Sequence, residues 1–311
     1  MRKEIREVDN ERGIVRITTP DERWYMKPSE DPVTKLPIYL PVPSSTWIAE
    51  YWPKGIYFYK WLADKGWNEA EAIKVAAGDK GSKVHLAISA ILEGKEVRID
   101  SKFVNPSTGN EEELTTEEVD CIMSFVNWRK DIEVDYIVES IVWDKVVFSD
   151  QHNYAGTLDW VIRVTLREGG KNHLKIDRPT IYIVDFKTSA NLWTSFEIQL
   201  AEYAHTVENG ENPIMKDGQQ INVAGLRRAI LQVGYKRNKD GYKWNEIADA
   251  WDKFLVAQKI WKSETEGQAP KQRDYPIVIS PAVVKMVQEG KTEISTEPVN
   301  VVETIKKTKK K

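Results

Sequence analysis

The chain has 311 residues, with 48 acidic and 45 basic side chains and a single cysteine, Cys121. A chain of this length buries roughly three-quarters of its unfolded surface, so its core needs no disulfide or structural metal. One cysteine excludes an intramolecular disulfide, a four-thiolate zinc site and an iron–sulfur cluster, and it fits a reducing compartment. The formal net charge of −3 excludes nucleic-acid binding through bulk positive charge, although it allows a local basic groove.

The sequence carries no recognisable targeting signal. Its first 13 residues are charged throughout and lack the apolar centre of a signal peptide. The longest stretch without a formal charge, Leu36–Ala49, is interrupted by three prolines and is too short to span a bilayer. We therefore expect a soluble, cytoplasmic protein with no membrane partner.

The N-terminal part of the chain changes from an extended to a helical pattern. Alternating residues 13–27 predict a hairpin that turns at Pro20-Asp21, and the proline-rich residues 28–43 predict an extended connection. Helix-start signals and apolar spacing then indicate a helical region. Four helices are predicted there, starting at or near Ser44, Gly55, Asn68 and Gly78, and the last one ends at Gly94.

The middle of the chain has the pattern of a sheet. Residues 95–115 predict a surface excursion, and a helix is expected from Thr116 to about Arg129. Segments rich in Val, Ile, Tyr and Trp then predict a meandering three-stranded sheet. Its strands are expected at Val134–Val147, Gly156–Leu166 and Thr180–Thr188.

Further elements complete a mixed α/β fold, with a central sheet flanked by helices. They are a helix at Trp193–Val207, a strand at 226–235, a turn at 238–241, a strand ending at Ile247 and a helix at Ala248–Glu264. We expect three parts: residues 1–43 as hairpin and connection, residues 44–266 as one α/β domain, and residues 267–311 as an extension with a basic, disordered tail.

One predicted strand ends in two charged residues. Side chains two apart share a face of a strand, so Asp185 and Lys187 project together while Phe186 points to the opposite side. If the strands pair through the loop 167–179, Asp159 converges with Asp185. Two carboxylates and an ammonium group together make a magnesium site beside a catalytic lysine. The alternative is an Asp–Lys pair on a solvated strand end, which so short a motif favours when taken alone.

Other polar residues lie where they can join this group. His85, on a predicted amphipathic helix, can add a nitrogen ligand, or it can be an ordinary surface or core histidine. Glu139 lies in an apolar strand, where a carboxylate is costly unless it is paired or ligating. Gln199 and Tyr203, four residues apart, share a helix face just after the Asp185 strand, which is also compatible with ordinary packing.

These residues occur in the order of known motifs. The set consists of G-x-x-x-H (Gly81 to His85), Glu139, G-x-x-D (Gly156 to Asp159), D-F-K-T (Asp185 to Thr188) and Q-x-x-x-Y (Gln199 to Tyr203). Over about residues 40–265, it resembles the RecB-type exonuclease branch of the PD-(D/E)XK nucleases, and is most similar to stand-alone phage and prophage exonucleases. The resemblance implies a restriction-endonuclease-like PD-(D/E)XK core with a helical N-terminal region.

The resemblance also implies roles for the individual residues. Metal ligands would be His85, Asp159, Asp185 and the backbone carbonyl of Phe186. Lys187 would be the catalytic lysine, Gln199 and Tyr203 would support the site and contact the DNA backbone, and Glu139 would be an accessory acid. Asp185 departs from the pattern, because many relatives have Glu there. The iron–sulfur cluster of some relatives is excluded by the lone cysteine.

The activity implied is a Mg²⁺- or Mn²⁺-dependent DNA exonuclease that acts on single- or double-stranded ends. Its setting would be phage or prophage recombination, repair or processing in a bacterial, archaeal or infected cell, with a recombination annealing protein as a possible partner. Two alternatives stay open: a structure-specific endonuclease on the same fold, and a non-catalytic DNA-binding recombination module.

Aromatic and basic residues offer a further contact with DNA. The chain has 12 tryptophans and 7 phenylalanines. Exposed rings could stack on the bases of a single-stranded end, and nearby cations could follow its backbone. The candidate cations are Arg227, Arg228, Lys236 and Arg237. The alternative is that most of the tryptophans are core residues and that these cations coat an exposed hairpin.

Overall fold

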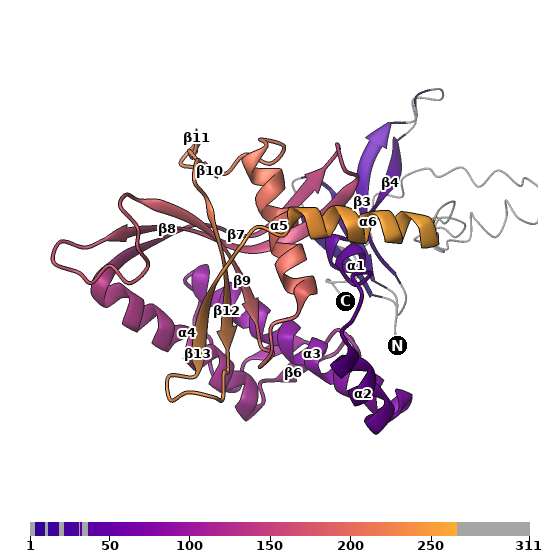
Figure 1. The fold of residues 1–311 in the computed structure, drawn as a ribbon, viewed down its shortest axis with the longest axis horizontal. Coiled ribbons are helices and arrows are strands. Elements are labelled where there is room, and N and C mark those ends of the chain that lie inside the picture. Colours follow the sequence, from indigo (N-terminus) through magenta and orange to yellow (C-terminus); the bar gives the residue numbers. More distant parts are fainter. Residues whose placement is uncertain (1–3, 10–11, 19–21, 31, 33–36, 266–311) are drawn as a thin grey trace, which may run out of the picture.

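The computed structural model describes residues 4–9, 12–18, 22–30, 32 and 37–265. A five-stranded mixed sheet, in the order β13-β12-β9-β8-β7, lies at the centre (Figure 1). β7 (Tyr136–Ser149), β8 (Tyr154–Leu166) and β9 (Thr180–Lys187) form an antiparallel meander. β12 (Arg227–Val233) runs parallel to β9, and β13 (Tyr242–Ile247) is antiparallel to β12. The predicted α/β class and the three-stranded meander are confirmed.

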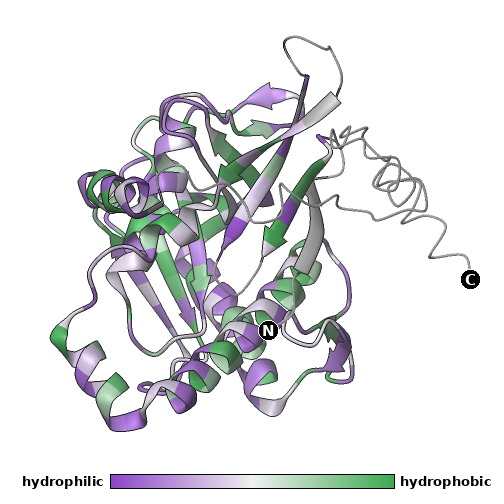
Figure 2. Ribbon diagram, turned by 90° about the vertical axis from the view of Figure 1, so that its right-hand side faces the viewer, coloured by the Kyte–Doolittle hydropathy of each residue, from purple (hydrophilic) through white to green (hydrophobic). Residues whose placement is uncertain are grey.

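Helices cover both faces of this sheet. α3 (Trp67–Leu92) and α4 (Thr116–Asp135) pack on one face, where Val84 and Phe125 join a core with Trp160. α5 (Thr194–Glu208) packs on the other face, against side chains such as Ile183. Figure 2 shows the apolar colouring on the inner strands and a mixed pattern along the helices. α3, α4 and α5 therefore each bury an apolar stripe against the sheet.

The N-terminal residues form a second, four-stranded antiparallel sheet. Its strands are β1 (Glu4–Asp9), β2 (Ile14–Thr18), β3 (Arg23–Glu30) and β4 (Pro37–Pro43). The β2–β3 hairpin is the predicted one, but the expected connection at 28–43 is wrong because β4 pairs with β3. Its prolines are tolerated because β4 is an edge strand, and Pro28 lies beyond the part of β3 that pairs with β2.

This second sheet shares a core with the rest of the chain. α1 (Ser45–Ala49) and α6 (Trp251–Thr265) lie against it. The ring centroids of Trp24 and Trp47 are 5.2 Å apart, and those of Trp47 and Trp261 are 5.4 Å apart. The division expected at residue 43 therefore falls inside one packed cluster of aromatic side chains.

The helical region differs from the prediction at its glycines. α2 (Ile56–Lys65) begins after Gly55 as expected, but α3 runs unbroken through Gly78 where two helices were predicted. A glycine inside a helix costs about 1 kcal/mol relative to alanine, which packing against the sheet offsets. α4 extends to Asp135, beyond the predicted end near Arg129, and a capping box between Thr115 and Glu118 fixes its start.

Two small hairpins lie in the connections. β5 (Lys102–Val104) pairs with β6 (Glu111–Glu113) inside the predicted surface excursion, and β10 (Met215–Lys216) pairs with β11 (Gln219–Gln220) after α5. Within the described parts of the chain, no helix combines the length and apolar character needed to cross a membrane. The basic tail predicted within 267–311 lies outside the described residues.

Gly156 is required by a close approach of α5 and α1 to β8. A Cβ atom there would lie 2.3 Å from the Tyr203 ring and 2.7 Å from the Ser45 hydroxyl. We expect Gly156→Ala to lower the free energy of unfolding by about 1–3 kcal/mol. Gly78→Ala is the control, because nothing lies within 4 Å of its added Cβ, and a helical site should gain about 1 kcal/mol. Urea denaturation measures both; equal stability of the two variants would contradict the packing.

Candidate active site

The C-terminal end of β9 changes from apolar to charged on one face. Ile183 belongs to the core under α5, and Asp185 and Lys187 continue the same alternating face. Phe186 points to the opposite side, into the core formed with α3 and α4. The Nζ of Lys187 lies 2.7 Å from Oδ2 of Asp185, whose side chain is only 1% exposed. The strand therefore holds a buried carboxylate against an ammonium group.

β8 brings a second carboxylate to this place. Trp160 pairs with Val184 across the antiparallel strands, so Asp159 lies at the level of Asp185. Oδ2 of Asp159 accepts a hydrogen bond of 2.8 Å from the backbone N–H of Phe186. The predicted pairing of these strands, and with it the convergence of the two aspartates, is confirmed.

α3 contributes the imidazole of His85. Its Nε2 donates to the Phe186 carbonyl at 2.8 Å, and its Nδ1 lies 3.4 Å from Oδ1 of Asp159. Gly81, one turn earlier, faces the residue after Lys187, and a Cβ there would make an ordinary contact of 3.6 Å with the Thr188 hydroxyl. The G-x-x-x-H segment therefore brings the histidine to the strand end.

Burial and charge shift the pKa values of this group in different directions. Burial raises the pKa of Asp185 to about 6 against the attraction of Lys187. Burial opposes the ionised form of Asp159 as well, but the positive charge of His85 outweighs it and lowers the Asp159 pKa. Burial disfavours the imidazolium of His85, yet Asp159 raises the His85 pKa to about 9. His85 is therefore protonated at neutral pH when no metal is bound.

α5 and α1 complete a hydrogen-bonded network around the lysine. Oε1 of Gln199 accepts a 3.1 Å bond from Nζ of Lys187. Nε2 of Gln199 donates to the Tyr203 hydroxyl at 2.6 Å and to Oγ1 of Thr46 at 3.0 Å. Both amide donors are thus occupied by hydroxyl oxygens, which turns the amide oxygen toward Lys187.

Thr46 and Gln232 belong to this site but were missed in the sequence. Thr46 follows two serines that indicated only a helix start. Gln232 pairs with Lys187 in the register of β12 and β9 and is 1% exposed. Its amide donates to the Ser189 carbonyl at 2.7 Å, which fixes the turn after β9. A single polar residue in the apolar run Ala229–Val233 was the available signal.

Glu139 lies apart from this cluster. It pairs with Arg163 in the register of β7 and β8, four residues along β8 from Asp159, or about 13 Å at the rise of a strand. Its carboxylate forms ion pairs with Arg163, at 2.7 Å, and with Lys216. Glu139, which the resemblance makes an accessory acid, therefore does not contact the cluster in this structure.

The cations of the β12–β13 region are paired within the protein. Arg228 contacts Glu208 at 2.6 Å, and Lys236 contacts Glu117 at 2.8 Å. The same holds for the other two candidates, with partners Glu246 for Arg227 and Asn191 for Arg237. Lys236 and Arg237 are exposed next to the turn between β12 and β13, which agrees with the alternative that these cations coat an exposed hairpin, whereas Arg228 is only 13% exposed.

The donor groups at the end of β9 suit a divalent cation by their chemistry. Two carboxylates, one backbone carbonyl and one imidazole are ligands that Mg²⁺ or Mn²⁺ accepts. In the structure these groups contact one another instead, since Lys187 holds Asp185 and His85 holds Asp159 and the Phe186 carbonyl. Among the described residues, no three His, Cys, Asp or Glu side chains are already grouped as a metal site. Cation binding would therefore have to displace these internal contacts.

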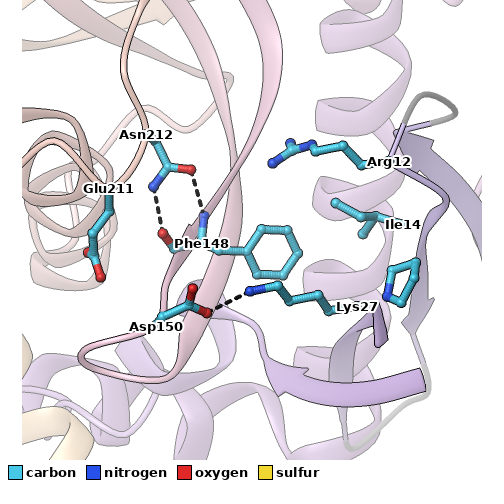
Figure 3. Close-up of a pocket in the computed structure, with 8 residues that line it drawn as sticks. Arg12, Ile14, Lys27, Phe148, Asp150, Glu211 and Asn212 are labelled. Atoms are coloured by element: carbon cyan, nitrogen blue, oxygen red, sulfur yellow. Dashed lines mark hydrogen bonds and ion pairs between the residues drawn. The ribbon is translucent and has the colours of Figure 1, made fainter. Parts of the chain in front are cut away.

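A cavity of about 390 Å³ lies elsewhere, at the far end of α5 (Figure 3). Phe148, Lys27 and Arg12 line one part of it, and Asn212 bonds both the N–H and the carbonyl of Phe148. The Nζ of Lys27 lies 2.7 Å from Oδ1 of Asp150. Arg12 and Glu211, which also line it, bond the Val146 carbonyl and the Ser149 hydroxyl, and none of the predicted site residues lines the cavity.

No protein-family model matches the chain, and no curated protein is significantly similar to it.

The pKa of His85 can be tested without metal. In EDTA, we expect its imidazole to titrate near pH 9, and Asp159→Asn to bring the pKa below the ordinary value, because burial and the charge of Lys187 then outweigh the attraction of Asp185. The ion pair stabilises the fold fully below pH ~6.5, and this contribution is lost as pH rises through about 9. NMR titration, with His85→Gln to assign the signal, measures it. A wild-type midpoint at or below 6.5 would contradict the Asp159 contact.

Proposed function

We propose that the protein is a Mg²⁺- or Mn²⁺-dependent DNA exonuclease built on a PD-(D/E)XK core. The observation that carries this proposal is the contact of Lys187 with the buried Asp185 at the end of β9, beside Asp159 of the neighbouring strand. A cluster of buried charged side chains at the end of a strand is costly for stability and is typical of a functional site. The ordered motifs in the sequence supply the reaction class.

The metal would be held by Asp159, Asp185, the Phe186 carbonyl and His85. When bound, it would polarise a phosphate oxygen and lower the pKa of a bound water molecule. His85 must lose its proton to act as a ligand, because a metal binds the neutral imidazole. Its raised pKa therefore makes metal binding weaker as the pH falls below about 9.

Lys187 provides the positive charge that stays with the protein. Its side chain is 15% exposed, and its ammonium group contacts Asp185 and Gln199 and lies 4.8 Å from the centre of the Phe196 ring. In this position it can orient a water molecule or stabilise negative charge that develops on the phosphate. Asp185 and Gln199 fix its direction, which reduces the reorganisation needed during the reaction.

Replacing Lys187 tests the assignment. We expect Lys187→Ala to slow cleavage of linear DNA at least about 10²-fold, because it removes a charged group at the reacting phosphate. Lys216→Ala is a matched control, since Lys216 also pairs with a carboxylate, that of Glu139, but outside the cluster. Release of end-labelled nucleotides measures both variants. Wild-type rates for Lys187→Ala would refute the proposal, provided that thermal melting shows both variants to be folded.

Thr46 is a positioning residue for the same site. Thr46→Val removes one acceptor of the Gln199 amide, and we expect kcat to fall roughly 3- to 10-fold, the effect of losing one hydrogen bond. KM for DNA and the melting temperature should change little, and Thr46→Ser should restore the rate. Failure of serine to restore it, with a matching loss of thermal stability, would show that Thr46 acts only in packing.

A further inference from the structure

Glu202 of α5 carries a carboxyl group that is enclosed in the core of the protein. The residue is 0% exposed, and neither of its carboxyl oxygens has a hydrogen-bond partner among the described residues. Glu118, in contrast, is buried but pairs with Lys83 at 2.9 Å and accepts a hydrogen bond from the backbone N–H of Thr115. An ionised carboxylate without a partner is too costly to hold in such a position. Glu202 is therefore a neutral acid in the folded chain.

No cation faces this carboxyl group among the described residues. Burial raises the pKa of Glu202 well above its usual range, and the hydroxyl of Ser45, at the start of α1, opposes this rise. From β8, the Tyr154 hydroxyl donates to the backbone carbonyl of Glu202 at 3.0 Å. On α6, Lys253 reaches α5 but pairs with Glu197 at 2.9 Å. The other titratable groups at this junction are Tyr203 and His205 on α5, Tyr25 on β3 and Glu211, which acts on Tyr154.

The helix that carries Ser45 also carries the contact that orients Gln199. Thr46, the next residue of α1, accepts a hydrogen bond of 3.0 Å from Nε2 of Gln199, and the amide oxygen of Gln199 accepts from Lys187. Ser45 is tightly packed, because a Cβ at Gly156 of β8 would lie 2.7 Å from its hydroxyl. Since α1 is only five residues long, a movement of Ser45 away from α5 would also break the Thr46 contact.

We propose that Glu202 is a positioning residue that makes the closure of α1 on α5 depend on pH. The closed arrangement requires the neutral acid, whereas in an open arrangement water reaches the carboxyl group and the group ionises. Each pH unit above about 4.3, the ordinary pKa of glutamic acid, therefore favours the open arrangement about tenfold, until the enclosed acid itself loses its proton. Opening removes Thr46 from the amide of Gln199. The effect on catalysis rests on the proposed nuclease function, whereas the closure itself does not.

Hydrogen exchange in α1 tests the closure of the full chain without DNA or metal. The amides to follow are those of Ile48 and Glu50, which donate to the carbonyls of Ser44 and Thr46. The variant for comparison is Glu202→Gln, which keeps the size of the side chain but cannot ionise. Between about pH 6 and pH 8, the ratio of the wild-type exchange rate to that of the variant should rise about tenfold per pH unit.

Stability at pH 7 provides the matched control for this comparison. Glu202→Gln should be at least as stable as wild type in urea denaturation, because folding then needs no proton uptake. Glu118→Gln should be less stable than wild type, because it leaves Lys83 buried without its carboxylate. A ratio of exchange rates that stays constant with pH overturns the proposal. Failure of Glu202→Gln to fold, or a stability below that of wild type, also overturns it, since a neutral amide is harmful only where the ionised carboxylate is needed.

Cleavage of linear DNA tests the link from Glu202 to the candidate active site. As the pH rises above neutral, kcat of wild type should fall below that of Glu202→Gln by up to roughly 3- to 10-fold, the effect of losing one hydrogen bond, with KM unchanged. In a Thr46→Val background, Glu202→Gln should leave the pH profile unchanged, because the contact is already absent.

The possible outcomes separate this inference from the proposed function. Equal pH profiles for wild type and Glu202→Gln, or a difference that persists in the Thr46→Val background, overturn the positioning role and leave the nuclease standing. Absence of cleavage by wild type with either metal refutes the nuclease and the positioning role together, and the exchange rates of α1 then decide the pH-dependent closure alone.

Discussion

A buried carboxylate at the end of β9 sets the character of the whole site. Asp185 is almost fully enclosed, and an enclosed charge is costly unless a partner compensates it. Lys187 supplies that partner at 2.7 Å, yet burial still holds the pKa of Asp185 at about 6. Replacing a buried ion pair with well-packed apolar residues is often neutral or stabilising. The charges are therefore better explained by binding and chemistry than by stability.

The place of β9 in the sheet explains why other groups gather around it. Its neighbours are β8 and the parallel strand β12, with helices on both faces. Each contributes one group: Asp159 comes from β8, Gln232 from β12, His85 from α3 and Gln199 from α5. The apolar layers of the sheet end at this level, so the polar groups meet in a partly enclosed position where electrostatic interactions are strong.

Local patterns were sufficient for the meander and for the meeting of Asp159 with Asp185. Dense β-branched and aromatic runs and the strict alternation of strands determine both. Contacts that depend on tertiary packing were not predictable. Thr46 reaches Gln199 across 153 positions, and the proline-rich β4 becomes a strand only because β3 offers an edge. Glu139 fits the motif order, yet its strand position leaves it opposite Arg163.

The most direct test of the proposed nuclease is digestion of end-labelled linear DNA and covalently closed circular DNA by the full chain. Parallel reactions contain Mg²⁺, Mn²⁺ or EDTA. The proposal predicts release of nucleotides from linear DNA with either metal, no cleavage of the closed circle, and no activity in EDTA, because the site requires both a metal and a free end. Cleavage of the closed circle would show an endonuclease, and intact linear DNA under all conditions would contradict catalysis at Asp185 and Lys187.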